Sequence, residues 1–297
     1  MQRKLIQLSP STAVVSLPSS WIKANALKKG AELVLEEVEN KIIISLKSVK
    51  NGKEITIDIS NLPDKLMWVS IHAAYVQGYD SIILVTRDSE QTFFMNKVVQ
   101  YFPGMIIYEE HKNSVHFKDI GEEANGEKFD LNKLLNRIFH LIATLFDDAL
   151  QAAKTKDWSL LANIKKRDYV INSYIAYYFR HMNKSRYNPF SKIGTMHSYV
   201  KILEMFADQI CILFKVIGKQ KLQVKNELSI LTELLNLYRK LQSLHFGFTQ
   251  EKFVAFENSR LVLNDSVVSL QEHTQLYAAE LLELLFDLEE LDVELNI

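Results

Sequence analysis

The spacing of apolar and polar residues changes twice along the 297-residue chain, and each change predicts a different kind of structure. In residues 1–48, short alternating or β-branched stretches predict strands at 3–8, 13–17 and 31–46. The last stretch is expected to fold into a hairpin around Glu39-Asn40, and residues 18–30 predict a short helix closed by Gly30. A segment this small has little core of its own, so we expect oligomerisation to complete it.

Residues 49–122 change to an alternation of strands and helices, which predicts a small α/β connecting domain of order β-α-β-α-β-β. The last two strands form a hairpin around Lys112-Asn113-Ser114. The first helix is expected to bury one face, made of Leu66, Val69, Ala73 and Val76. The elements are expected at 54–59, 62–78, 80–86, 89–104 and 105–117.

Residues 127–297 follow a polar linker and predict an all-α domain. Six helices are expected, at about 129–155, 157–184, 191–219, 223–246, 249–267 and 270–295. They divide into two groups of three, which indicates a bundle with an internal repeat. The third and last helices carry narrow apolar seams with steps of three and four, formed by Met196, Val200, Leu203, Ala207, Ile210, Phe214 and Ile217 and by Tyr277, Leu281, Leu284, Leu288, Leu291 and Leu295.

Charge is distributed unevenly, although the formal net charge is only −1. Up to Gly30 every charged residue is a cation, whereas the final stretch, LYAAELLELLFDLEELDVELNI, is rich in Asp and Glu. A partner meets local charge, so the basic end favours contact with nucleic-acid phosphates. A solvated basic surface would give the same pattern. The cations are Arg3, Lys4, Lys23, Lys28 and Lys29.

Cysteine usage and hydropathy indicate the compartment. The single cysteine, Cys211, excludes an intrachain disulfide and favours a reducing environment. No apolar run approaches the ~20 residues that span a bilayer, so we expect a cytoplasmic protein without membrane insertion. The chain has no Walker loop, Gly-rich dinucleotide motif or HExxH spacing, and Cys211 is expected to pack and not to react. We therefore do not expect an enzyme.

The stretch TAVVSLPSSWIKANALKKGAELVLEEVENKIIISL resembles the swapped-hairpin domain of the AbrB/MazE/SpoVT family. The shared features are VVSLP, a short helix bearing a Trp, KKG and a closing hairpin. The resemblance implies a homodimer in which two chains interleave into one small β-barrel with a DNA-facing basic surface. Where the family has a loop glycine, this chain has Ser9-Pro10-Ser11. Arg3 and Lys4, expected at a strand edge, are the strongest candidates for DNA contact.

The helical segment resembles PhoU proteins. YVKILEMFADQICILFKVIG is similar to the PhoU helix that carries a Glu-x-x-x-Asp pair, and LYAAELLELLFDLEE is similar to its second copy. At the other two PhoU positions one acid of each pair is replaced, by Ile164 and Leu261. The resemblance implies a divalent metal or iron on the remaining carboxylates. These are Asp168, Glu204, Asp208, Glu257, Glu283 and Asp287.

A solvated or salt-bridged helix face explains the same acidic spacing, because both intact pairs lie about 100° from the apolar seam. The stretch NSYIAYYFRHMNKSRYNPF also has two interpretations. Its aromatic and basic residues suit an anion or nucleic acid, or they form core positions with a helix end capped by cations.

All three parts, in this order, resemble archaeal proteins that join an AbrB-like domain to a PhoU domain and are regarded as phosphate-uptake regulators. The first hypothesis is therefore a dimeric DNA-binding transcriptional regulator of phosphate uptake, with the bundle as sensor or docking surface. The alternative is an interaction protein that acts on a phosphate transporter or signalling partner, its hairpin domain serving only dimerisation. A carboxylate metalloenzyme is a third hypothesis, and it lacks a nucleophile, a base and a histidine ligand pattern.

Overall fold

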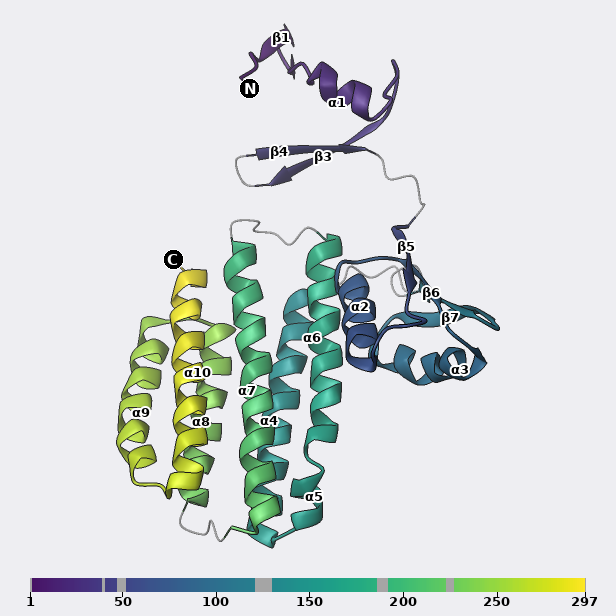
Figure 1. The fold of residues 1–297 in the computed structure, drawn as a ribbon. Helices are drawn as coiled ribbons and strands as arrows, with labels where there is room; N and C mark the ends of the chain where they lie inside the picture. Colours follow the sequence, from purple (N-terminus) through teal and green to yellow (C-terminus); the bar gives the residue numbers. More distant parts are fainter. Residues whose placement is uncertain are drawn as a thin grey trace. The chain divides into compact units, whose positions relative to one another are not determined.

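The computed structural model divides the chain into two compact units, residues 1–51 and 52–297 (Figure 1). Each unit is described by itself. The structure describes residues 2–38, 41–46, 52–120, 130–185, 192–222 and 227–296.

The first unit consists of two separate antiparallel strand pairs and one short helix. β1 pairs with β2 and β3 pairs with β4, so one chain closes no barrel among its described residues. The predicted turn at Glu39-Asn40 lies outside the described residues. Gly30 follows the helix in the left-handed region, with φ +85°, where a side chain would be strained. The elements are β1 Ile6–Ser9, β2 Thr12–Val14, α1 Ser19–Ala24, β3 Leu33–Val38 and β4 Lys41–Leu46.

The second unit begins with a four-stranded sheet of order β5-β6-β8-β7. β5 and β6 are parallel and are joined through α2, whereas β8 is antiparallel to both of its neighbours. The predicted β-α-β-α-β-β order and the hairpin turn at Lys112-Asn113 are confirmed. The elements are β5 Glu54–Asp58, α2 Asp64–Val76, β6 Ser81–Val85, α3 Ser89–Val98, η1 Val99–Tyr101, β7 Met105–His111 and β8 Ser114–Asp119.

The predicted buried face of α2 was wrong. Leu66 and Val69 are each 50% exposed, and the buried side chains are instead Met67, Ile71, Ala74 and Tyr75. Apolar residues occur nearly all round this helix, so spacing alone did not choose between its faces. The face of α2 that is buried is determined by its packing against β5, β6 and α6.

The helical segment contains α4 Leu131–Thr155, α5 Trp158–Ala162, α6 Lys165–Ser185, α7 Ile193–Gln220, α8 Leu228–His245, α9 Gln250–Val268 and α10 Glu272–Asn296. The helix predicted over 157–184 is divided into α5 and α6. The short α5 packs on α7 at Gly218, where an added Cβ would lie 2.6 Å from the Leu161 Cβ. Leu161 and Ile164, on either side of the break at Asn163, are both fully buried in this core.

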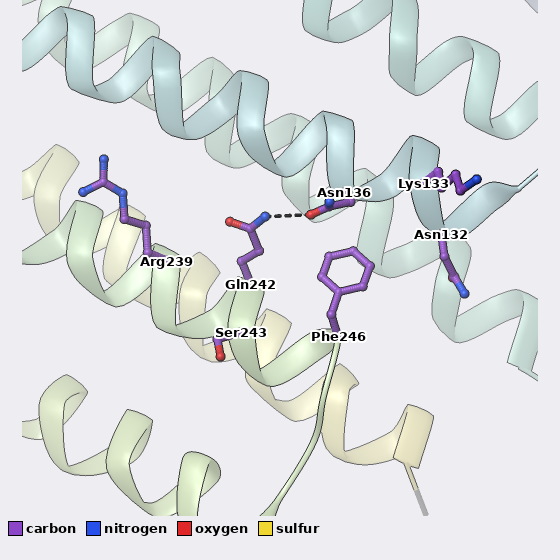
Figure 2. Close-up of a pocket in the computed structure, with 7 residues that line it drawn as sticks. All are labelled: Asn132, Lys133, Asn136, Arg239, Gln242, Ser243 and Phe246. Atoms are coloured by element: carbon purple, nitrogen blue, oxygen red, sulfur yellow. Dashed lines mark hydrogen bonds between the residues drawn. The ribbon is translucent and has the colours of Figure 1, made fainter.

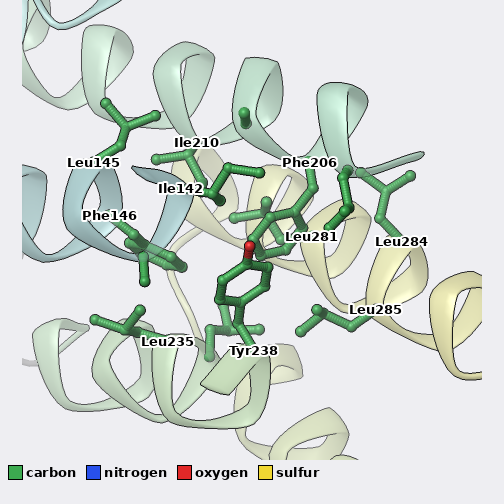
Figure 3. Packing of buried hydrophobic residues seen from close by; sticks show 14 of the residues in the cluster. Ile142, Leu145, Phe146, Phe206, Ile210, Leu235, Tyr238, Leu281, Leu284 and Leu285 are labelled. Atoms are coloured by element: carbon green, nitrogen blue, oxygen red, sulfur yellow. The ribbon is translucent and has the colours of Figure 1, made fainter. Parts of the chain in front are cut away.

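The two predicted seams lie in the core of the bundle. Every seam residue of α7 is buried, and in α10 Leu281, Leu284 and Leu288 are buried while the outer seam residues are partly so. Figure 3 shows Phe206, Tyr238 and Leu281 meeting from three helices, and the Phe206 and Tyr238 rings stack at 5.0 Å. α7 packs along α10 and α4 along α8, while α6 and α9 each pack against the other two helices of their own triplet (Figure 1).

A buried ionic cluster joins the sheet to the bundle inside the second unit. Arg180 of α6, 1% exposed, donates to the Tyr75 carbonyl oxygen at 2.7 Å and to Asp119 Oδ2 at 2.6 Å. Lys184 donates to Asp80 and Asp119 at 2.6 and 2.7 Å. These cations of the aromatic-basic stretch therefore face carboxylates of the same chain. Tyr178 and Phe179 beside them are core residues, which supports the structural interpretation of that stretch.

Replacing Asp119 tests this cluster. Asp119→Asn leaves the Arg180 charge buried with less compensation, so we expect the free energy of unfolding to fall by about 3 kcal/mol. Urea denaturation followed by circular dichroism measures the change. The matched control is Glu109→Gln on the same sheet, whose carboxylate is 55% exposed. We expect a change below about 0.5 kcal/mol there, and equal effects of both variants would contradict a stabilising role for the cluster.

Candidate nucleic-acid interface and carboxylate clusters

The predicted DNA-contacting cations are all exposed on the first unit. Arg3 and Lys4 precede β1 and do not lie on a strand, which corrects their expected placement. Lys23 lies in the last turn of α1, and Lys28 and Lys29 occupy the turn before Gly30. None of the five forms an ion pair with a described residue. Their charges are thus available to an anionic partner.

The described part of this unit has no hydrophobic interior of its own. Of its described side chains, none is buried. In the β3–β4 hairpin, Leu35 lies opposite Ile44, and Leu33 opposite Leu46. Residues directly opposite share a face, so the next pair on this face is Glu37 and Ile42, and the face is apolar except for Glu37. On this face Leu35 is 63% and Ile42 68% exposed.

The short β1–β2 pair repeats this arrangement. Ile6 lies opposite Val14, and Ile6 and Leu8 are 53% and 66% exposed. Burying a side chain of this type stabilises by about 1.5–3 kcal/mol. These two apolar faces are exposed to solvent in the described part of the unit. Packing against another protein surface would exclude water from both of them.

The first carboxylate cluster lies between α6 and α7. Asp168 is 1% exposed, its Oδ2 accepts from Asn172 Nδ2 at 2.9 Å, and its Oδ1 has no hydrogen-bond partner. Burial, followed by the nearby Asp208 charge, raises the pKa of Asp168 to about 7. Glu204 contributes a weaker effect and accepts from Lys201 at 2.6 Å.

Two further residues lie near this cluster. His72 of α2 has a lowered pKa, mainly through burial, and the Glu204 charge opposes that shift. Cys211 is buried, and burial raises the pKa of its thiol to about 12, so it is not a thiolate at neutral pH. The packing role predicted for Cys211 agrees with this environment.

The second cluster contains its own cation. Arg260 donates to both carboxylate oxygens of Glu257, at 2.6 and 2.7 Å, and its guanidinium lies 4.6 Å from the Phe286 ring centroid. Glu289 is 2% exposed, and burial followed by the Glu257 charge raises its pKa to about 8. Burial and the Glu283 charge also raise the pKa of Asp287.

Cation binding at these carboxylates remains a prediction. The unpartnered oxygens of Asp168 and Asn172 have the hard-ligand chemistry that divalent cations prefer. Within the described ranges, however, no three His, Cys, Asp or Glu side chains lie close enough together to hold one metal ion. The Lys201–Glu204 and Arg260–Glu257 pairs are those expected of a salt-bridged helix face.

Four residues in or near the two carboxylate clusters were not predicted from the sequence, namely His72, Asn172, Arg260 and Glu289. Two of them had a signal, because Asn172 follows Asp168 by four residues and Arg260 follows Glu257 by three, which places each pair on one helix face. His72 and Glu289 had no such sequence signal, since packing between helices brings them near the carboxylate clusters.

The comparison with protein families finds one match. Residues 6–54 match the family described as antidote-toxin recognition MazE, bacterial antitoxin. The chain therefore carries a MazE/AbrB-type domain at its N-terminal end, followed by a mostly helical region. No curated protein and no solved structure matches the chain. Among the described helices, none has the length and apolarity needed to cross a membrane.

Asp168→Asn gives a pH-dependent prediction. Because the folded-state pKa is raised from 3.8 to about 7, ionising Asp168 opposes folding increasingly between these values and fully above the higher one. We expect Asp168→Asn to be neutral near pH 4 and to stabilise by about 2 kcal/mol near pH 8. Urea denaturation with a chelator present measures both, and a pH-independent difference would contradict the raised pKa.

Proposed function

We propose that the protein is a dimeric DNA-binding regulator. Two copies of the N-terminal unit supply each other's core and present their cations to the DNA backbone. The observation that carries the proposal is the combination, within one MazE/AbrB-type domain, of exposed apolar strand faces and five exposed cations without described ion-pair partners. The first feature requires a second chain, and the second favours a polyanion.

Dimerisation strengthens the electrostatic part of this proposal. Each phosphate contact releases counterions. For each contact, the affinity for DNA therefore falls about tenfold when the salt concentration rises tenfold. Two copies present twice the number of cations, and their two-fold symmetry favours a palindromic site. The exposed cations are proposed to set orientation and affinity, because phosphate contacts carry no base sequence directly.

The helical segment is proposed to sense an effector or to dock a protein. A role in phosphate uptake, through a phosphate transporter or signalling partner, rests on the resemblance of the 129–295 stretch to PhoU proteins. Coupling between such a ligand and DNA would be reciprocal, so DNA would change the ligand's affinity by the same factor.

A protein-interaction role is the second candidate. The description of the matched family concerns recognition of a toxin, which is consistent with binding to a partner other than DNA. In this case the strand faces hold the dimer and the cations stay solvated. DNA retention separates the two functions, because only the first predicts binding that weakens steeply with salt.

The dimer is tested by charges on the apolar hairpin face. Leu35→Asp with Ile42→Asp places carboxylates at the proposed interface, so we expect the particle mass to fall from twice 34.4 kDa to 34.4 kDa. Light scattering on the eluting protein measures it. Lys41→Glu, on the opposite hairpin face, is the matched control and should leave the mass unchanged. A wild-type protein that is already monomeric would contradict the proposal.

DNA contact is tested by a salt series with a promoter fragment from the gene's own locus. Arg3→Ala with Lys4→Ala removes two cations per chain, so the log–log salt slope should become shallower by about two units per chain. Lys65→Ala with Lys97→Ala removes two exposed cations of the second unit and should leave the slope unchanged. Identical slopes for both double variants would favour the protein-interaction role.

A further inference from the structure

A shallow groove of about 520 Å³ lies along the contact between α4 and α8, outside both carboxylate clusters (Figure 2). It falls within the size range of small-molecule sites, roughly 300–1,000 Å³. Its lining contains two cations and no carboxylate. The lining residues are Asn132, Lys133, Asn136, Arg239, Gln242, Ser243 and Phe246.

The two cations have no partner of their own. Lys133 and Arg239 are exposed, and neither side chain forms a hydrogen bond or an ion pair with a described residue, although the Lys133 backbone N–H donates to Asp130. Figure 2 shows them toward opposite ends of the groove, one from each helix. This differs from Arg180, which is buried, and from Arg260, which is partly buried, since each of these contacts carboxylates. The lining of the groove therefore carries two cationic side chains that form no ion pair with a described residue.

The centre of the groove is polar on one side and aromatic on the other. Gln242 Nε2 donates to Asn136 Oδ1 at 2.8 Å, which leaves the Asn136 amide nitrogen and the Gln242 carbonyl oxygen without a described partner. The Phe246 side chain is 41% exposed. Its ring is held in place by the Phe139 and His245 rings, with centroids 5.7 and 4.9 Å away. A fixed, half-exposed ring beside hydrogen-bonding groups suits a flat ligand.

We propose that this groove binds a small organic anion that combines an aromatic ring with phosphate groups, the chemistry of a nucleoside phosphate. The ring stacks on Phe246, the ring edge hydrogen-bonds to the Asn136–Gln242 pair, and the phosphates pair with Arg239 or Lys133. Aromatic stacking and charge-assisted hydrogen bonds are both worth more than neutral surface contacts.

The groove also adjoins a buried chain of polar groups. His245, next to Phe246, contacts Asp292 of α10 at 2.6 Å, and Tyr199 of α7 donates to the same carboxylate at 3.1 Å. A ligand that stacks on Phe246 therefore contacts the residue beside a polar link between three helices. Binding itself does not depend on the proposed DNA-binding function, because the groove lies wholly on the bundle.

Isothermal titration of the full-length protein with ATP, in magnesium-free buffer at low salt and without DNA, tests the proposal directly. We expect saturable binding of ATP, with adenosine and inorganic phosphate each at least about tenfold weaker, since each carries only one of the two features. Lys133→Gln with Arg239→Gln should weaken ATP binding about tenfold or more, and Phe246→Ala should do the same.

Lys240→Gln is the matched control. Lys240 is the next residue of α8, is exposed, and donates to Ser259 outside the groove. The Lys240→Gln variant should bind ATP with unchanged affinity. Circular dichroism should show that all variants remain folded. Three outcomes would overturn the proposal: no heat of binding up to about 10 mM ATP, equal affinity for ATP and inorganic phosphate, or equal losses in the control and the groove variants.

Discussion

The strand pairs of the N-terminal unit have hydrogen-bonded backbones, but none of the unit's described side chains is buried beneath them. Their apolar faces, β3–β4 above all, are exposed in one chain. An isolated two-stranded hairpin is at best marginally stable in water, and a domain as small as this one buries a smaller share of its surface than a larger domain does. The chain's only cysteine lies in α7, far along the sequence, so no intrachain disulfide stabilises the unit. In the proposed dimer a second chain supplies the core, and the proposed DNA surface depends on it.

The second unit has the opposite character. A continuous core runs through the helical bundle, and the α/β part adds a second core that meets α6. Where these two parts meet, Arg180 and Lys184 pair with Asp80 and Asp119. Removing one partner would leave a buried charge uncompensated, which makes the junction sensitive to the loss of any one of these charges. The sheet and the bundle therefore form one structural unit, although the sequence pattern differs sharply between them.

Periodic features were predictable from sequence, and features that depend on tertiary contact were not. The seams of α7 and α10 follow from steps of three and four, and the β7–β8 hairpin follows from its turn residues. The buried face of α2 was predicted wrongly because apolar residues surround it. Arg180 reaches partners 61 and 105 residues away, which no local spacing indicates.

The candidate site shows the same division. Asp168 was identified from the resemblance of its sequence segment to PhoU proteins, and the structure adds that one of its oxygens is buried without a described partner. The pairing of Glu257 with Arg260 had a local signal that was not used. The cations of the first unit were evident from composition, whereas the apolar faces beside them required the strand register.

Hydrogen exchange across a dilution series tests the central claim most directly, that a second copy completes the N-terminal unit. The account predicts that amides of β3 and β4 lose protection as the particle mass falls to that of one chain, while amides of α7 and α10 stay protected. Protection of β3 and β4 that persists in the monomer would show that the unit is stable alone, and would contradict the account.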